Sequence, residues 1–292
     1  MKPRVAVLPG DGIGPEVVAA ALDRLGDRIE TTFIEAGAER YLATGELLTG
    51  GDLSTIVDSD ALLFGAIGDP RVPDGVLERG ILLRLRKELD LYANLRPFPE
   101  LDLVFVRENT EGLYAGFGWS SADSAAEVNV NTVAAVSRVV RYAFDLAESR
   151  SHHLTWVHKT NVLTHSGGLW REVVAAVAEE HPGVEVAYEH VDAAAYHLVV
   201  DRDRFDVIVT DNLFGDILSD LAAGLAGGLG TAASANLHPD ASTRPGRCIG
   251  LFEPIHGSAP DIAGTSTADP TAAIRALEML LEAVETKELT IA

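Results

Sequence analysis

The sequence alternates along almost its whole length between short apolar runs and longer amphipathic stretches. Residues 5–8, 61–67 and 205–209 have the composition of buried strands, and the stretches that follow them have helical spacing. A chain in which strands and helices alternate favours a mostly parallel sheet with helices on its faces. We therefore expect an α/β fold, and 292 residues are enough for two domains with cores of ordinary size.

Composition excludes several kinds of partner. The apolar fraction of 47% describes a globular chain, and no apolar run approaches the ~20 residues of a membrane span. The net charge of −21 argues against binding to nucleic acid, whose phosphates attract basic surfaces. The N-terminus lacks the apolar region of a signal peptide, and the single cysteine, Cys248, fits a reducing compartment. We expect a cytoplasmic protein that binds neither membranes nor nucleic acid.

Two aspartates, Asp216 and Asp220, follow the expected strand at 205–209. If Gly215 forms a turn and a helix begins at Asp216, the two carboxylates lie on one face. The opposite side should then be buried through Ile217, Leu218 and Leu221. Like charges at this spacing cost about 0.2–0.5 kcal/mol unless a cation lies between them, and Mg²⁺ or Mn²⁺ suits oxygen-only ligands. A helix start whose acids merely suit the helix dipole is the alternative.

Cationic residues near the ends of expected elements are candidates for substrate binding. In a chain this acidic, an anionic substrate needs a local group of cations, and Arg86, Arg96 and Arg107 can supply one. Arginine binds carboxylates through two parallel hydrogen bonds. The alternative is three separate surface arginines that pair with acidic neighbours. Lys159, after the expected strand at 153–157, is either a solvated residue or a group for proton transfer.

Two segments rich in turn-forming residues are candidates for binding a nucleotide. The glycines at 10, 12 and 14 lack the spacing of a dinucleotide fingerprint, so they form either a ligand-binding turn or simply a tight turn. In the segment at 252–264, Gly257 and Ser258 present backbone N–H groups, and Asp261 offers a carboxylate to two ribose hydroxyls. A carboxylate repels a 2′-phosphate, so NAD is expected in preference to NADP.

Four motifs in unbroken order resemble those of the β-decarboxylating dehydrogenases, the family of isopropylmalate and isocitrate dehydrogenases. They are Leu-Pro-Gly-Asp-Gly-Ile-Gly-Pro-Glu at 8–16, Asn-Leu-Arg-Pro at 94–97, Asp-Asn-Leu-Phe-Gly-Asp-Ile-Leu-Ser-Asp at 211–220, and His-Gly-Ser-Ala-Pro-Asp-Ile-Ala-Gly at 256–264. The resemblance covers nearly the whole chain. It implies the family's two-domain fold, with a mostly parallel central sheet and the active site in the interdomain cleft. We expect a cofactor-binding domain of 1–97 with 228–292, and a substrate, metal and dimerisation domain of 98–227.

The resemblance also implies roles for individual residues in the oxidation and decarboxylation of a small 2-hydroxy acid. The residues that resemble the carboxylate-binding arginines are Arg86, Arg96 and Arg107. Tyr114 resembles the tyrosine that protonates the enol after CO₂ leaves. Lys159 resembles the lysine that handles the hydroxyl proton.

The metal and the cofactor have implied ligands as well. The residues that resemble the ligands of Mg²⁺ or Mn²⁺ are Asp192, Asp216 and Asp220. In this family Lys159 and Asp192 come from the partner subunit, which implies a homodimer with shared active sites. The implied NAD-binding residues are Ile13, Gly68, Asn161, Glu253, His256, Gly257, Ser258, Ala259, Asp261 and Asp269. NADP-using relatives carry a Lys-Tyr pair in place of Asp261-Ile262.

The substrate is expected to be 3-isopropylmalate, an intermediate of leucine biosynthesis. Isocitrate enzymes carry a serine and an asparagine before the first arginine, whereas Leu82 and Leu83 stand there in this chain and suit an isopropyl group. The segment at 75–83 is similar to that of actinobacterial-type 3-isopropylmalate dehydrogenases. Two departures, a short loop at 97–102 and a segment at 107–114 like that of the isocitrate, homoisocitrate and tartrate branch, leave open another 3-substituted malate, including D-malate. A non-catalytic family member that acts as a binding or regulatory subunit is also left open.

Overall fold

The computed structural model describes residues 2–240, 242–286 and 289. The chain divides into two compact units, Met1–Leu91 with Gly227–Ile291 (unit 1) and Tyr92–Ala226 (unit 2). The sequence-based boundaries were 97/98 and 227/228. The first differs because residues 93–98 pair with the strand at 103–108 and therefore belong to unit 2.

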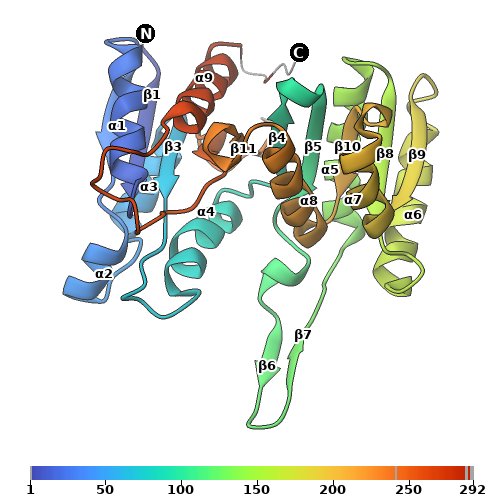
Figure 1. Ribbon diagram of the computed structural model, residues 1–292, viewed down its shortest axis with the longest axis horizontal. Helices are drawn as coiled ribbons and strands as arrows, with labels where there is room; N and C mark the ends of the chain where they lie inside the picture. The colour runs from blue at the N-terminus through green and yellow to red at the C-terminus, as the bar shows by residue number, and fades with distance from the viewer. Residues whose placement is uncertain (1, 241, 287–288, 290–292) are drawn as a thin grey trace. The chain divides into compact units, whose positions relative to one another are not determined.

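Unit 1 is built on a sheet in the order β2-β1-β3-β12-β11, in which the first four strands are parallel and β11 runs antiparallel to β12 (Figure 1). Its strands are β1 (Arg4–Gly10), β2 (Glu30–Phe33), β3 (Ala61–Ala66), β11 (Ala233–Leu237) and β12 (Gly250–Pro254). Its helices are α1 (Gly14–Leu25), α2 (Ala38–Thr44), α3 (Gly50–Asp58), α4 (Leu83–Glu88) and α9 (Thr271–Thr286). A π-helical turn at Glu78–Leu82 leads into α4, and a 3₁₀ turn covers Leu229–Thr231.

Apolar residues explain how this sheet is covered. All six residues of β3 are buried, as expected of a parallel strand covered on both faces. Helices α1 and α9 pack against each other and against β3, so they cover one face. On the other face, Ile56 of α3 and Leu85 of α4 join a core that includes Ala6 and Leu8 of β1. This packing fixes the face that α4 presents and therefore the position of its arginines.

Unit 2 is built on a sheet in the order β4-β5-β10-β8-β9, which is parallel except for the antiparallel pair β4–β5. Its strands are β4 (Ala93–Phe98), β5 (Leu103–Glu108), β8 (His153–His158), β9 (Glu185–His190) and β10 (Val207–Thr210). Its helices are α5 (Val133–Glu148), α6 (Thr164–Ala178), α7 (Val191–Val200) and α8 (Asn212–Leu225), and 3₁₀ turns cover Pro99–Leu101, Leu113–Ala115 and Arg202–Arg204. The expected α/β fold with mostly parallel strands is confirmed.

A two-stranded hairpin projects from unit 2 (Figure 1). It consists of β6 (Gly118–Ser120) and β7 (Ala125–Glu127), which pair antiparallel to each other. Two large apolar side chains near it, Phe117 and Trp119, are each 59% exposed. Among the described residues, no helix is both long enough and apolar enough to cross a membrane.

Three local predictions are wrong. Helix α8 begins at Asn212 rather than at Asp216, because the Asp211 carboxylate accepts a hydrogen bond from Phe214 N at 2.8 Å and so caps the helix. Gly215 consequently lies inside the first turns of the helix. Ile217, expected in the core, is 58% exposed. Residues 252–254, expected in a loop, belong to the buried strand β12.

Candidate active site

Four of the predicted site residues of unit 2 meet around the carboxylate of Asp216. This carboxylate accepts hydrogen bonds from Arg107 Nη1 at 2.5 Å, Arg96 Nη2 at 3.2 Å and the Tyr114 hydroxyl at 2.7 Å. Arg96 Nη1 also donates to Asp220 at 3.2 Å. The guanidinium group of Arg96 therefore bridges the two aspartates, which satisfies the requirement for positive charge between them.

The secondary structure explains how this group is assembled. Asp216 and Asp220 are four residues apart on α8, so they share the face that the arginines reach. Arg96 lies on β4 and Arg107 on β5, two paired neighbouring strands. Burial raises the pKa of Asp220, and the charge of Asp216 raises it further, whereas the charge of Arg96 lowers it. A hard divalent cation fits this donor set of carboxylate oxygens.

Asn212 fixes the side chain of Arg107, and one guanidinium nitrogen of Arg107 remains available as a hydrogen-bond donor. The side chain is 1% exposed, and its Nε donates to the carbonyl oxygen and the Oδ1 of Asn212 at 2.7 and 3.0 Å. Its Nη2 is buried and has no hydrogen-bond partner among the described residues. A buried guanidinium nitrogen without a partner is a natural donor to a carboxylate ligand. The guanidinium carbon also lies 5.0 Å from the ring centroid of Tyr114.

Gly215 is needed where it is because of Arg107. A Cβ atom on Gly215 would lie 2.6 Å from Cγ and 2.8 Å from Cβ of Arg107. We expect Gly215→Ala to lower the free energy of unfolding by about 1–3 kcal/mol, because overpacking forces Arg107 out of its position. Gly224→Ala on the same helix is the matched control, since nothing lies within 4 Å of its added Cβ. The control should raise stability by about 0.5–1 kcal/mol. Equal stabilities in urea denaturation would contradict this packing.

Lys159 and Asp192 form a second group in unit 2. The Lys159 ammonium donates to Asp192 Oδ1 at 2.5 Å, and this hydrogen bond lowers the pKa of Asp192. Lys159 follows the last residue of β8, and Asp192 lies in the first turn of α7. Within this chain, the residues of unit 2 with predicted catalytic and metal-binding roles therefore form two sets. One set surrounds Asp216, and the other consists of Lys159 and Asp192. Asn161, a predicted cofactor residue, is exposed two residues after Lys159.

The predicted metal ligands do not form a three-residue cluster within the single chain. Among the described residues, the carboxylate and imidazole atoms that gather within 4.8 Å of one another belong to Asp145, Glu148 and His181. His181 Nδ1 lies 2.9 Å from Glu148 Oε1, so this group is explained as an ion pair near the surface. The role of Asp192, Asp216 and Asp220 as ligands stays a prediction.

The third predicted arginine, Arg86, belongs to unit 1. It lies on α4, is 5% exposed, and its Nη2 lies 3.3 Å from Glu253 Oε1 on β12. Glu253 also accepts a hydrogen bond from Asn236 Nδ2 at 2.8 Å. Leu82 and Leu83 precede Arg86 by four and three residues, so all three share one side of the helical segment.

Several predicted cofactor residues of unit 1 line up around one loop. The carbonyl oxygen of Ser258 accepts a hydrogen bond from Ile13 N at 2.8 Å, and a Cβ on Gly12 would lie 1.9 Å from that oxygen. Gly68 and Ser258 both line a pocket of about 240 Å³ together with Glu78. The glycines at 10–14 thus allow a close approach to the protein's own backbone at Ser258, and the binding of a ligand by this turn stays a prediction.

The remaining cofactor residues lie in or next to the same loop. His256 Nε2 is buried without a hydrogen-bond partner among the described residues, so it can still bind a ligand. Ala259 has a φ of +38°, a left-handed conformation that is uncommon for a residue with a side chain. Asp269 accepts hydrogen bonds from Thr271, which lower its pKa. Gly257 and Asp261 are exposed. This loop fits a nucleotide, and the individual contacts stay predictions.

Sequence reasoning missed the residues that hold the arginines. Ser219 accepts a hydrogen bond from Arg96 Nη1 at 2.7 Å, and Asn94 Oδ1 accepts one from Arg96 Nε at 3.0 Å. The carbonyl oxygen of Asn212 accepts a hydrogen bond from Arg107 Nε. Asn94 lies two residues before Arg96 on one strand, and Ser219 lies directly before Asp220, so both carried a positional signal.

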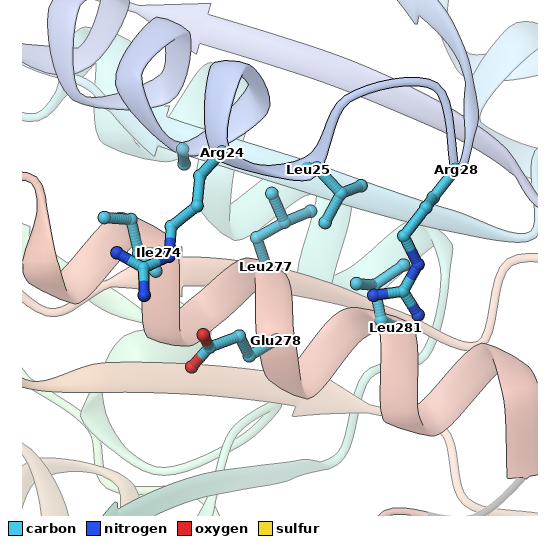
Figure 2. Close-up of a pocket in the computed structure, with 8 residues that line it drawn as sticks. Arg24, Leu25, Arg28, Ile274, Leu277, Glu278 and Leu281 are labelled. Atoms are coloured by element: carbon cyan, nitrogen blue, oxygen red, sulfur yellow. The ribbon is translucent and has the colours of Figure 1, made fainter.

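Another cavity of unit 1 lies away from the predicted cofactor loop. It encloses about 190 Å³ between α1 and α9 and is lined by Arg24, Leu277 and Glu278 among others (Figure 2). Figure 2 shows leucine side chains between the two helices, with Arg24 of α1 and Arg28, which follows that helix, at the margin of the cavity. No predicted site residue lines this cavity.

Known proteins of one family resemble this chain over nearly its whole length. The model of the isocitrate/isopropylmalate dehydrogenase family matches residues 4–290. A 3-isopropylmalate dehydrogenase of Nocardia farcinica is 54% identical over 95% of this chain and 88% of its own length. One from Mycobacterium ulcerans is 53% identical with the same coverage. Among solved structures, isocitrate dehydrogenase from Methylococcus capsulatus has a TM-score of 0.86 at 40% identity, over 97% of this chain and 86% of its own. A β-decarboxylating dehydrogenase from Thermococcus kodakarensis has a TM-score of 0.81 at 43% identity, over 98% of this chain and 84% of its own.

Proposed function

The chain belongs to the isocitrate/isopropylmalate dehydrogenase family, and on that premise we propose that it oxidatively decarboxylates 3-isopropylmalate with NAD and Mg²⁺ or Mn²⁺. The observation that carries the proposal is the convergence of Arg96, Arg107 and Tyr114 on Asp216. This convergence supports the proposal, because guanidinium groups suit substrate carboxylates, a hydroxyl suits proton transfer and carboxylate oxygens suit a metal ion. The reaction belongs to leucine biosynthesis, and a cytoplasmic location stays a prediction.

The substrate carboxylates are bound by the arginines. Arg107 Nη2, which has no partner among the described residues, donates to a carboxylate oxygen, and Arg96 presents its guanidinium from the neighbouring strand. Because both side chains are buried and held by Asn212, Asn94 and Ser219, they are already oriented before the substrate arrives. Such preorganisation reduces the entropy lost on binding. The contribution of Arg86 stays a prediction.

Two proton-transfer groups serve the two chemical steps. Asp216 and Asp220, with Asp192 of the partner subunit, would hold the metal ion. The bound ion would make the substrate hydroxyl more acidic and stabilise negative charge after CO₂ leaves, while NAD accepts the hydride. Lys159 takes up the hydroxyl proton during oxidation. The Tyr114 hydroxyl, 2.7 Å from Asp216 in the free enzyme, supplies a proton to the carbon that loses CO₂.

Exposed apolar side chains support a homodimer. On α7 and α8, which pack against each other, Tyr196, Val199 and Ile217 are 63%, 54% and 58% exposed. Large exposed apolar side chains on neighbouring elements are typical of sites of protein association. We infer that a second copy covers these side chains, and that this copy supplies Lys159 and Asp192. Ultracentrifugation would test the inference, and a monomer at micromolar concentration would contradict it.

A panel of substrates tests the proposed activity. NADH formation should be fastest with 3-isopropylmalate and at least about 10-fold slower with isocitrate, homoisocitrate, tartrate and D-malate. Leu82 and Leu83 leave the additional polar group of the first three unpaired, and D-malate lacks the apolar substituent that these leucines would contact. EDTA should abolish the reaction, and added Mg²⁺ or Mn²⁺ should restore it. The main alternative is isocitrate, favoured by the 40% identity to an isocitrate dehydrogenase. If 3-isopropylmalate is among the poorest substrates, the proposed substrate is wrong.

A further inference from the structure

One buried pair of titratable residues in unit 2 has no part in the reaction described above. His158 is the last residue of β8, and Asp211 caps α8. The His158 side chain is 0% exposed, and neither of its ring nitrogens has a hydrogen-bond partner among the described residues. Buried polar groups in native proteins are almost always paired, so an imidazole in this state requires an explanation.

The geometry offers one partner for this imidazole. His158 Nε2 lies 3.9 Å from Asp211 Oδ2, about 1 Å beyond hydrogen-bond distance. The other carboxylate oxygen of Asp211 is occupied by Phe214 N. The imidazole ring has two aromatic neighbours, with centroids 5.9 Å away for Trp170 and 5.6 Å away for Phe214. These neighbours restrict the movement of the imidazole ring. A shift of about 1 Å brings His158 Nε2 within hydrogen-bond distance of Asp211 Oδ2.

The electrostatics favour such a contact. Burial lowers the pKa of His158 to about 4. Burial also raises the pKa of Asp211 to about 6, where the charge of Glu108 on β5 adds to the increase and the charge of Arg107 opposes it. Each group is thus destabilised in its charged form. A hydrogen bond from a neutral imidazole to the carboxylate stabilises the Asp211 charge and satisfies one ring nitrogen.

We propose that His158 and Asp211 are positioning residues, whose hydrogen bond fixes the strand end that carries Lys159 against the start of the helix that carries Asp216 and Asp220. His158 directly precedes Lys159, and α8 directly follows Asp211. The inference rests on the proposed function, because only there are Lys159 and the two aspartates the reacting groups. In the proposed dimer these two groups of one chain serve different sites, and the pair positions each of them without touching the substrate.

Kinetics distinguish positioning from simple packing. We expect His158→Gln to lower kcat about 10²-fold with little change in KM, since a displacement of about 1 Å can cost this much. His165→Gln, an exposed histidine on α6, is the matched control and should leave kcat unchanged. In His158→Ala, added imidazole should restore part of kcat, whereas thiophene, a ring of similar size without an N–H group, should not. Equal rescue by both rings would overturn the proposal.

A second measurement needs neither turnover nor a His158 variant. The ¹⁵N spectrum of histidine-labelled wild-type protein should contain a ring protonated at Nε2, with a slowly exchanging proton that disappears in Asp211→Asn. The same spectrum in both proteins would overturn the hydrogen bond, whatever the substrate panel gives. A wild-type protein with this signal but no activity would overturn the proposed function and the positioning role together. An active enzyme without the signal would overturn the pair alone.

Discussion

Replacing Asp216 by asparagine is expected to lower kcat for NAD reduction by about 10³-fold or more, because the variant loses a negative charge of the proposed metal site. The carboxylate is 35% exposed, and its environment is otherwise made of donors: Arg96, Arg107 and Tyr114 all point at it. Asparagine keeps the shape of the side chain but presents one amide nitrogen, itself a donor, to this group. The initial rate of NADH formation at saturating Mg²⁺ measures the loss.

The same variant has a predicted effect on folding and on metal affinity. Two buried guanidinium groups lose a charged acceptor, so the free energy of unfolding should fall by about 1–3 kcal/mol. Mn²⁺ binding, followed by electron paramagnetic resonance, should weaken in parallel with kcat. Asp203→Asn is the control, since that side chain is 95% exposed and lies outside both residue groups of unit 2. An Asp216→Asn enzyme with near-normal turnover would remove Asp216 from the reaction.

The fold was predictable because its signals are local. Strands such as β3 are continuous apolar runs, and the helices between them have 3.6-residue spacing, so the α/β class followed directly. The start of α8 was misjudged because Gly215 was interpreted as a turn residue. Its role is tertiary, since it makes room for Arg107 from another strand. A cap at Asp211, by contrast, was a local signal that the sequence contained.

The sequence predicted only those parts of the site that depend on residues within a single motif. The spacing of Asp216 and Asp220 placed them on one face, but the bridge by Arg96 depends on β4 lying next to β5 and α8 packing on both. The β4–β5 pair is formed by strands that are consecutive in the chain, but α8 follows β10, and the position of β10 beside β5 is not encoded locally, because whole helices separate these two strands in the chain. For the same reason, no sequence pattern indicated that His158 faces Asp211. Their strands, β8 and β10, are neighbours although more than one helix separates them in the chain.

The strongest test of the shared site is complementation between two inactive variants. Lys159→Met should lower kcat by about 10²–10⁴-fold, because proton transfer is lost while the aliphatic part of the side chain remains. Lys159 and Asp216 belong to different groups within the chain, and a shared site takes one group from each subunit. A hybrid dimer of Lys159→Met with Asp216→Asn therefore contains one complete site. Co-expressed with different tags and purified, it should recover about half of the wild-type activity.

The control for this experiment uses Lys159 and Asp192, which are hydrogen-bonded to each other in the structure. Lys159 and Asp192 are 2.5 Å apart, so the same subunit supplies both to any one site. In a hybrid of Lys159→Met with Asp192→Asn, each site receives one of the two defects, and activity should not recover. Recovery in this control would mean that Lys159 and Asp192 reach one site from different subunits. No recovery in the Lys159→Met and Asp216→Asn hybrid would mean that each chain builds its own site. The second copy would then contribute stability alone, through the apolar surface of α7 and α8.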